Sequence, residues 1–250
     1  MRRIWVDPSN IQEPQFELID ESFKHAIQVS RFRVGEPFEV VSGQDFALEV
    51  KLIEIKKKSA TVEVVGRRAL PPIAMPYIRL AFAVSKWSTF ENVLEKSVEL
   101  GVSSIQPLIT DFSFIRAKKD WPDSRTDRFQ KIIRGATEQC GRGRLMELRN
   151  PLTLQEFITD LNPSDSTVGL FAYEGPSVLD IRAQLSLLNK PGLKEIWAIV
   201  GSEGGFSEDE VSQIKSIGLP PVTMGAQILR AETACLAMVS VIKYELGLMR

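Results

Sequence analysis

The stretch "AIVGSEGGFSEDEV", residues 198–211, runs from an apolar segment through a glycine-rich turn into a serine followed by three acidic residues. The apolar run over residues 196–200 predicts a short buried strand. Ser207, with Glu210 three residues later, has the capping-box pattern that begins helices. We therefore expect a strand, a turn and a helix in that order, with the helix beginning at Ser207.

The glycine-rich turn is a candidate anion site, because the N–H groups and the dipole at a helix start attract phosphate. The local charges argue against that ligand, since no Lys or Arg lies nearby in the chain and four carboxylates would surround the anion: Glu203, Glu208, Asp209 and Glu210. The glycine spacing also fits neither the P-loop nor the dinucleotide-binding fingerprint. A neutral or cationic ligand is favoured.

The composition indicates an ordinary globular protein of one or two domains, with 250 residues of which 44% are hydrophobic and 25% charged. The sequence has no apolar run of about 20 residues, the length of a membrane span, and its first residues lack the apolar core of a secretory signal. We expect a cytoplasmic protein. Cys140 and Cys235 follow no metal-ligand spacing and are expected to be reduced, mostly buried thiols, and His25, the only histidine, is interpreted as structural or substrate-facing.

Charge is distributed unevenly along the chain. Residues 1–150 carry 24 Lys and Arg against 20 Asp and Glu, whereas residues 151–250 carry 7 against 12. Residues 116–149 alone hold ten basic and five acidic residues. This excess is typical of a surface that lies along RNA or DNA, and a solvated helix face is the alternative.

The periodicity changes near residue 70. Residues 38–65 alternate in strand fashion with hairpin-like breaks, which predicts a small β-barrel preceded by a helix over 21–32. After a proline-rich linker, strands over 78–84, 105–109, 167–173, 196–200 and near Val222 alternate with helices over 89–100, 123–140, 178–188, 207–216 and 232–246. Such alternation implies a parallel sheet covered by helices on both faces.

Three glycine-bearing segments end strands of this predicted sheet: "FAYEG" (171–175), "VGSEGG" (200–205) and "MGAQILRAETA" (224–234). Ligands bind beyond the carboxyl ends of parallel strands, so convergence of the three would form a pocket with an apolar slot from Val200, Ile228 and Leu229. Each segment taken singly is also consistent with an ordinary tight turn. Arg230 and Glu232 beside this slot are either functional or a structural salt bridge.

The paired segments "VGSEGGFSEDE" and "MGAQILRAETA" resemble those of the RsmE-type ribosomal RNA uracil-N3 methyltransferases, members of the SPOUT superfamily. Further matching segments are "HAIQVSRFRVG" (25–35), "EKSVELGVSSIQPL" (95–108) and "ATEQCGR" (136–142), so the resemblance covers nearly the whole chain. Two positions depart from the family pattern. Ser202 stands where proline is usual, and Gln227 where arginine is common.

The resemblance implies an α/β fold in which a C-terminal SPOUT domain with a trefoil knot follows a small PUA-like β-barrel. The corresponding divisions are 1–70 for the RNA-binding barrel, 71–76 for the linker and 77–250 for the methyltransferase domain. It also implies a homodimer that uses S-adenosylmethionine, without a metal or a membrane, to methylate N3 of a uridine in 16S ribosomal RNA of the small ribosomal subunit. The sulfonium and ammonium of that cofactor outnumber its carboxylate, which agrees with the acidic loop.

The resemblance also guides the assignment of site residues. Cofactor binding is expected from Phe171, Tyr173, Glu174, Val200, Gly201, Glu203, Gly205, Met224, Gly225, Ile228, Leu229 and Ala234. Catalytic roles are expected for Arg230, Glu232 and Glu203, with Arg230 stabilising the charge that spreads over the uracil oxygens when N3 loses its proton. RNA contacts are expected from Arg31, Arg33, Lys86, Arg134, Arg142 and Arg144.

The proton acceptor stays open at this point between Glu203, Glu232, Glu138 and water. Glu203 facing the ammonium of the cofactor, and Glu232 bracing Arg230, are alternative roles for two of these carboxylates. Two other functions compete: ribose 2′-O-methylation by a related SPOUT enzyme, and non-catalytic RNA binding. A nicotinamide dehydrogenase is disfavoured because no GxGxxG turn follows the first strand of the α/β part.

Overall fold

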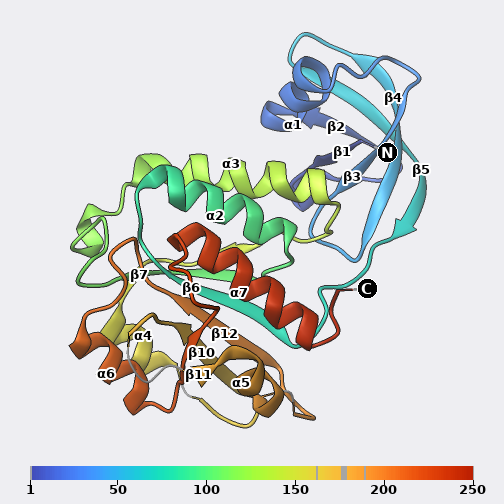
Figure 1. Cartoon of the computed structure of the whole chain (residues 1–250). Coiled ribbons are helices and arrows are strands. Elements are labelled where there is room, and N and C mark those ends of the chain that lie inside the picture. The colour runs from blue at the N-terminus through green and yellow to red at the C-terminus, as the bar shows by residue number, and fades with distance from the viewer. Residues whose placement is uncertain (1, 162, 176–178, 189, 250) are drawn as a thin grey trace. The chain divides into compact units, whose positions relative to one another are not determined.

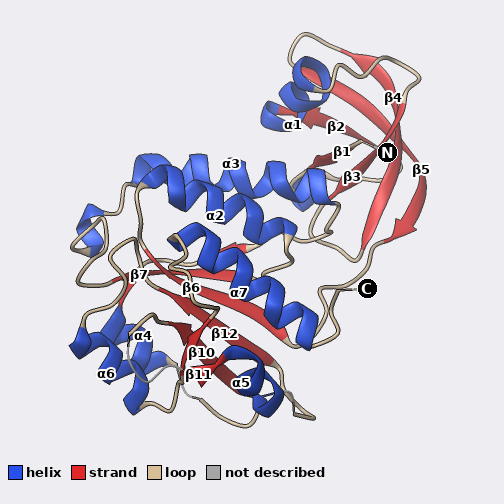
Figure 2. Ribbon diagram, viewed as in Figure 1, coloured by secondary structure: helices blue, strands red, loops and turns tan. Residues whose placement is uncertain are grey.

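The computed structural model describes residues 2–161, 163–175, 179–188 and 190–249 and contains two compact units (Figures 1 and 2). The first unit comprises Met1–Pro72 and Ile133–Leu145, and the second comprises Ile73–Ile132 and Met146–Arg250. The first division falls close to the expected linker. The return of residues 133–145 to the first unit was not predicted, because the helical pattern over 123–140 has no break at that point.

The first unit is built on a five-stranded, barrel-like sheet with strand order β1-β3-β4-β5-β2. Its strands are β1 (Arg3–Trp5), β2 (Gln15–Ile19), β3 (Pro37–Val41), β4 (Phe46–Ile55) and β5 (Ser59–Ala69). All neighbours are antiparallel except β1 and β3. Register shifts between β4 and β5 after Glu49 and Leu52 bend the long hairpin, as bulges do. The prediction of strands over residues 38–65 is confirmed.

The helix expected over residues 21–32 is shorter than predicted. It consists of α1 (Asp20–Lys24) followed by one π-helical turn, His25–Val29. The helix cannot continue, because Arg31 adopts the left-handed backbone conformation with a φ of 54°. The turn therefore leaves the side chains of Arg31 and Arg33 exposed, while Phe32 between them is buried in the core of the unit.

The second unit contains an eight-stranded sheet in which every pair of neighbours is parallel. The strand order is β11-β13-β10-β12-β6-β7-β8, with β9 also pairing β7. The strands are β6 (Tyr77–Ala83), β7 (Ser104–Ile109), β8 (Glu147–Leu148), β9 (Leu152–Thr153), β10 (Thr167–Ala172), β11 (Leu179–Asp180), β12 (Glu195–Val200) and β13 (Pro221–Thr223). The predicted parallel sheet is confirmed.

Helices cover both faces of this sheet, as the alternating pattern predicts (Figure 1). On one face, α7 (Ala231–Glu245) packs on β6 and β12 beside α2 (Trp87–Glu99). On the other, α4 (Leu154–Asp160) and α6 (Glu208–Ser216) enclose an apolar cluster that includes Phe157, Phe171 and Trp197. The remaining helices are α5 (Ile181–Leu188), beside β11, and α3 (Asp123–Cys140), within which the division between the units falls.

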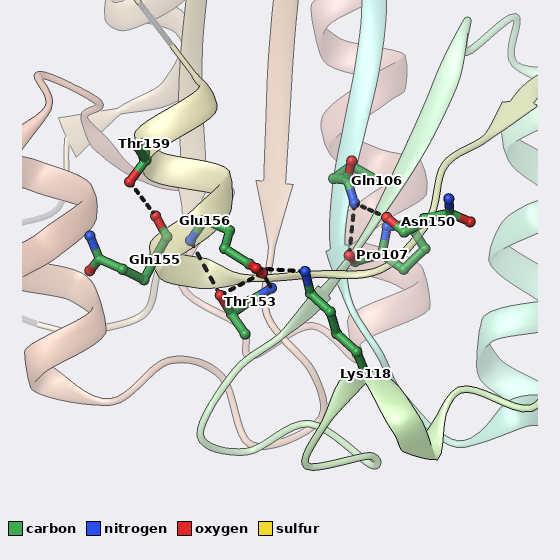
Figure 3. A network of polar contacts seen from close by, with 8 residues as sticks. All are labelled: Gln106, Pro107, Lys118, Asn150, Thr153, Gln155, Glu156 and Thr159. Atoms are coloured by element: carbon green, nitrogen blue, oxygen red, sulfur yellow. Dashed lines mark hydrogen bonds and ion pairs between the residues drawn. The ribbon is translucent and has the colours of Figure 1, made fainter.

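Helix α4 was not predicted from the sequence, because its seven residues are too few to show a clear helical period. Its start is nevertheless well defined by a capping box between Thr153 and Glu156 (Figure 3). One oxygen of the Glu156 carboxylate accepts from Thr153, and the Lys118 ammonium lies 2.6 Å from the other. This contact connects the segment after β7 to the helix. Lys118, together with the hydrogen bonds from Thr153, lowers the pKa of Glu156 to about 2.

Within the described part of the chain, no helix is both long and apolar enough to cross a membrane. The two cysteines form no disulfide. Cys235 is buried in α7, and its burial raises the pKa of the thiol, whereas Cys140 at the end of α3 is exposed. The expectation of mostly buried thiols is therefore confirmed for Cys235 and wrong for Cys140, the last residue of α3.

His25, the only histidine of the sequence, forms an ion pair within the first unit. His25 Nδ1 lies 2.9 Å from one carboxylate oxygen of Glu138, and the Trp5 backbone N–H donates to the other oxygen at 2.7 Å. The hydrogen bond with Glu138 raises the pKa of His25 above its ordinary value, against the opposing effect of burial. His25 is therefore structural in this unit, and both oxygens of Glu138 are engaged by residues of the same unit.

We predict that replacing Glu138 by Gln lowers the pKa of His25 toward its ordinary value of about 6.5. A single histidine makes the measurement direct, because the chain gives one imidazole Cε1–H resonance to follow by NMR against pH. Since the folded state binds the proton more tightly, the pair stabilises the protein fully below about pH 6.5, and this contribution is lost as pH rises through the raised pKa. Glu54→Gln in the same unit is the control, and an unchanged titration in Glu138→Gln would contradict the assignment.

Candidate functional site

A cavity of about 630 Å³ lies in the second unit at the carboxyl ends of three neighbouring strands, β10, β12 and β13. The strands are parallel, so the segments that follow them leave the same edge of the sheet and meet there. The cavity is also lined by Lys86 and Thr89 at the start of α2. The three glycine-bearing segments singled out in the sequence therefore form one site.

The segment after β12 is a tight loop that returns on itself. The Gly205 N–H donates to the Ser202 carbonyl at 2.9 Å, and Gly205 has a φ of +70°. A Cβ added to Gly201 would lie 2.8 Å from the carbonyl carbon of Gly205, which is backbone and cannot yield without opening the loop. Glycine at 201 is therefore required by close approach, and glycine at 205 by its left-handed conformation.

The outer side of this loop rests on the turn that follows β7. The Ser202 hydroxyl donates to the Phe112 carbonyl at 2.7 Å, and Ser202 is buried. A Cβ on Gly204 would lie 2.8 Å from the Phe112 Cβ, so the two segments pack without space for a further side chain. The serine at position 202 thus provides a hydrogen bond that proline could not donate.

The predicted capping box at the start of α6 is confirmed. Ser207 is the N-cap of this helix, its hydroxyl accepts from the Glu210 N–H, and the Glu210 carboxylate accepts from the Ser207 N–H at 3.0 Å. The second Glu210 oxygen accepts from the Asp111 N–H at 2.8 Å. Of the four acidic residues expected around the ligand, only Glu203 lines the cavity, because Glu208, Asp209 and Glu210 belong to the first turn of the helix.

The side chain of Glu203, in the loop after β12, reaches the N-terminus of α2. Its carboxylate accepts long hydrogen bonds from the Lys86 N–H at 3.4 Å and from the Thr89 hydroxyl at 3.5 Å. A negative charge is favourable at a helix N-terminus, where backbone N–H groups are exposed. Glu203 therefore connects the loop after β12 to α2 and presents the rest of its carboxylate to the cavity.

The segment after β13 forms the opposite wall. The Leu229 N–H donates to the Glu174 carboxylate at 3.2 Å, which joins this wall to the segment after β10. Gly225 has a φ of +129°, a conformation that side chains disfavour. Ile228 lines the cavity but is 82% exposed, so it lies at the rim rather than in an enclosed apolar slot.

Arg230 and Glu232 flank the start of α7 and both line the cavity. Arg230 is the N-cap residue, its side chain is exposed, and it makes no ion pair with any residue that the structure describes. The proposed bracing of Arg230 by Glu232 is therefore not formed. The structure leaves the guanidinium available beside the cavity, which favours a functional role over a structural salt bridge.

All but one of the residues expected to bind the cofactor line this cavity: Tyr173, Glu174, Val200, Gly201, Glu203, Gly205, Met224, Gly225, Ile228, Leu229 and Ala234. Phe171 is the exception. Its ring is fully buried in the core, 6.1 Å from the Phe206 ring in an edge-to-face arrangement. Phe171 still belongs to the strand β10, whose alternation points its side chain into the core rather than toward the ligand.

Further lining residues were missed: Thr89, Ala172, Gly175, Ser202, Gly204, Phe206, Val222, Thr223, Gln227 and Ala231. Most of them adjoin predicted residues on the same three segments. Thr89 carries no sequence signal, because it is remote in the chain and reaches the site only through the packing of α2.

The charged side chains at the cavity are two cations, Lys86 and Arg230, and three carboxylates, Glu174, Glu203 and Glu232. The site thus has one more carboxylate than cations. This balance suits a ligand with net positive charge and disfavours phosphate.

The six arginine and lysine candidates for RNA binding are not equivalent. Arg31 and Arg33 are exposed, and Lys86 lies at the cavity. Arg144 makes an ion pair with Asp45, at 3.1 Å between Nη2 and Oδ2, and burial lowers the pKa of Arg142. Arg134 is partly buried. Arg142 is therefore not an exposed cation, and Arg144 is exposed but already faces the Asp45 carboxylate.

The basic segment over 116–149 is also less cationic in space than in sequence. Glu91 pairs with both Arg125 and Arg128, and Glu156 pairs with Lys118. Acidic residues from other segments thus neutralise part of the excess. A count of charged residues within the segment could not reveal this, because the acidic partners belong to other parts of the sequence.

The comparisons with known proteins agree with this geometry. A family model described as an RNA methyltransferase domain matches residues 74–243. The ribosomal RNA small subunit methyltransferase E of Helicobacter pylori is 30% identical over 92% of this chain and 95% of its own length. The corresponding protein of Buchnera aphidicola is 25% identical over 98% of this chain and 94% of its own length.

Two solved structures are similar over nearly their full lengths. A Legionella pneumophila methyltransferase solved with the bound cofactor SAM has a TM-score of 0.86 at 30% identity, covering 97% of this chain and 96% of its own. A ribosomal RNA small subunit methyltransferase E from Neisseria gonorrhoeae, bound to S-adenosyl methionine, has a TM-score of 0.84 at 28% identity, covering 98% and 97%. With this family match and these full-length relatives, the chain belongs to the RsmE family of RNA methyltransferases.

Proposed function

We propose that this protein transfers a methyl group from S-adenosylmethionine to N3 of a uridine in 16S ribosomal RNA of the small ribosomal subunit. The observation that carries the proposal is the cavity at the ends of β10, β12 and β13, with an unpaired Arg230 at its edge. Relatives named ribosomal RNA small subunit methyltransferases, and a similar structure bound to S-adenosyl methionine, support it.

The residues at the cavity fit this cofactor. Gly201 and Gly204 keep the loop after β12 free of side chains that would clash with Gly205 and Phe112. Three carboxylates against two cations match a ligand whose sulfonium and ammonium outnumber its carboxylate. We assign Glu203 and Glu174 to the polar part of the ligand, and Val200, Met224 and Leu229 to its apolar surface.

S-adenosylmethionine, when bound, supplies a methyl group activated by its positively charged sulfur. The protein must then make N3 of uracil nucleophilic, which requires loss of the imide proton and stabilisation of the charge on the neighbouring oxygens. Arg230 is assigned to those oxygens, because a guanidinium at a partly desolvated site stabilises developing negative charge. No ion pair within the described residues competes for it.

Glu232 is assigned as the acceptor of the N3 proton. Glu138 is excluded by its contacts with His25 and Trp5, and Glu203 is engaged by Lys86 and Thr89. Glu232 lines the cavity and belongs to the same helical turn as Arg230, the N-cap residue. A base close to the cation that stabilises the product anion would allow proton removal and charge stabilisation to occur together.

The family resemblance supports four further assignments. We propose that the first unit is a PUA-like RNA-binding domain and that the second contains the trefoil knot of the SPOUT superfamily. We also propose that two copies form a homodimer in the cytoplasm. The exposed Val241 and Tyr244 on α7 offer apolar surface for such an association.

Gly201→Ala should lower the affinity for S-adenosylmethionine about tenfold or more, a change of about 1.4 kcal/mol. The added Cβ would lie within 3 Å of three backbone atoms of Gly205 and force the loop open. Isothermal titration calorimetry gives the affinity. Gly135→Ala is the matched control, because nothing lies within 4 Å of a Cβ there, and equal affinities in the two variants would contradict the cofactor assignment.

Arg230→Ala and Glu232→Gln should each reduce methyl transfer about 10²- to 10³-fold while S-adenosylmethionine still binds. The reason is that both side chains act on the base rather than on the cofactor. Labelled-methyl transfer to small ribosomal subunits, followed by nucleoside analysis, measures the rate and identifies N3-methyluridine. Only Glu232→Gln should abolish the acidic limb of the pH–rate profile.

Arg182→Ala is the matched control for Arg230, since Arg182 is exposed on α5 and does not line the cavity. Full activity in Arg230→Ala would remove this residue from the mechanism. A 2′-O-methylated nucleoside among the products would show that the methyl acceptor is a ribose hydroxyl and not N3 of uracil.

Arg31→Gln and Arg33→Gln should each flatten the dependence of RNA affinity on salt, by about one unit of the logarithmic slope per released contact. Both side chains are exposed, and neither makes an ion pair with a described residue. Arg144→Gln is the comparison, because Asp45 already compensates that charge, and it should change the slope less. An equal effect of all three substitutions would refute the distinction between paired and unpaired cations.

A further inference from the structure

Two aromatic side chains project into solvent from the turn that follows β7. Phe112 is 49% exposed and Phe114 is 52% exposed, whereas Ser113 between them is buried. Single apolar residues on a surface need no explanation, but two half-exposed rings within three residues form a local feature. Neither ring lines the cofactor cavity.

The turn that carries these rings is held rigidly. The Ser113 hydroxyl accepts from the Thr110 N–H at 2.9 Å and lies 3.3 Å from the Leu108 carbonyl. The Phe114 N–H donates to the Val84 carbonyl at 2.7 Å, and the Phe114 ring contacts the edge of Trp87, with 5.6 Å between centroids. The backbone that carries the rings is therefore held in place before a ligand contacts them, which lowers the conformational entropy lost on binding.

Phe112 adjoins the wall of the cavity directly. Its Cβ packs on Gly204, and its carbonyl accepts the hydroxyl of Ser202, both of which line the cavity. A ligand too long to fit within the cavity would extend over the neighbouring surface that carries Phe112. For the proposed function, that ligand is the RNA strand on either side of the target uridine.

Charge favours a nucleic acid as the occupant. The same turn continues into exposed Arg116 and Lys119, and exposed Lys86 lies at the adjoining cavity. Charged residues are depleted in the cores of protein–protein interfaces. Proteins that bind single-stranded RNA, in contrast, contact its phosphates with cations and its unstacked bases with aromatic rings. Two exposed rings followed by exposed cations on one segment fit a single-stranded RNA better than a second protein surface.

We propose that Phe112 stacks on a nucleobase of single-stranded RNA next to the target uridine and so holds the strand at the cavity. The proposal rests on the proposed function for the identity of the target. Stacking is tolerant of sequence, because every base has a flat apolar face. Phe112 therefore contributes affinity and position, and the choice of uridine belongs to the cavity.

Phe112→Ala tests this role with little risk to the fold, because alanine keeps the Cβ against Gly204 and the carbonyl that binds Ser202. The affinity for a uridine 12-mer, measured by fluorescence anisotropy, should fall about tenfold, whereas binding of an abasic ribose-phosphate 12-mer should not change. Phe112→Tyr should restore the affinity. Leu187→Ala, which removes a 62% exposed apolar side chain on α5 that does not line the cavity, should have no effect on either probe.

Methyl transfer to small ribosomal subunits gives an independent readout. Phe112→Ala should raise KM for the subunit about tenfold with S-adenosylmethionine affinity unchanged, and Phe112→Tyr should recover it. Equal binding of both 12-mers by wild type and Phe112→Ala would overturn the proposal. So would a shift in oligomeric state without a change in RNA affinity, since the ring would then contact a second copy.

The RNA-binding measurement does not depend on catalysis. If the wild-type protein transfers no methyl group to ribosomal RNA, the proposed function fails whatever the 12-mers show. If transfer occurs but Phe112→Ala leaves the 12-mer affinity unchanged, only the stacking role fails.

Discussion

The close approach of Gly201 to the backbone of Gly205 is the constraint on which the site depends. It allows the chain to leave β12, turn sharply and begin α6 at Ser207 within seven residues. Because the loop is this compact, the neighbouring strands β10 and β13 can bring their own segments to the same edge of the sheet. A larger residue at 201 would widen the loop into the space that those segments enclose.

Much of the second unit was predictable because its signals are local. The capping box at Ser207 and Glu210 marked the start of α6, and α3 matched its predicted bounds of 123–140. Convergence of the three glycine-bearing segments followed from the rule that parallel strands end at one edge. Short elements escaped prediction, since β8 and β9 have two residues each and owe their existence to pairing with β7.

The errors arose where tertiary contacts decide the outcome. Four carboxylates near the loop were counted as ligand-facing, yet Glu210 is turned back to the backbone of Ser207 and Asp111. Phe171 was assigned to the cofactor, but strand alternation directs it into the core. The ion pair of Arg144 with Asp45, 99 residues away in sequence, was likewise not foreseen. No local pattern in the sequence contains these partners.

The same contacts show how the structure separates cations with structural roles from those available to a ligand. Lys118, Arg125, Arg128 and Arg144 each face a carboxylate, whereas Arg230 faces the cavity without one among the described residues. An arginine at the N-terminus of a helix is unfavourable, because the dipole there repels positive charge. Placing Arg230 at the start of α7 thus lowers stability slightly, but it also leaves the guanidinium poised for an anion. An anionic uracil ring would suit this position, because its negative charge compensates both the Arg230 guanidinium and the exposed N–H groups at the start of the helix.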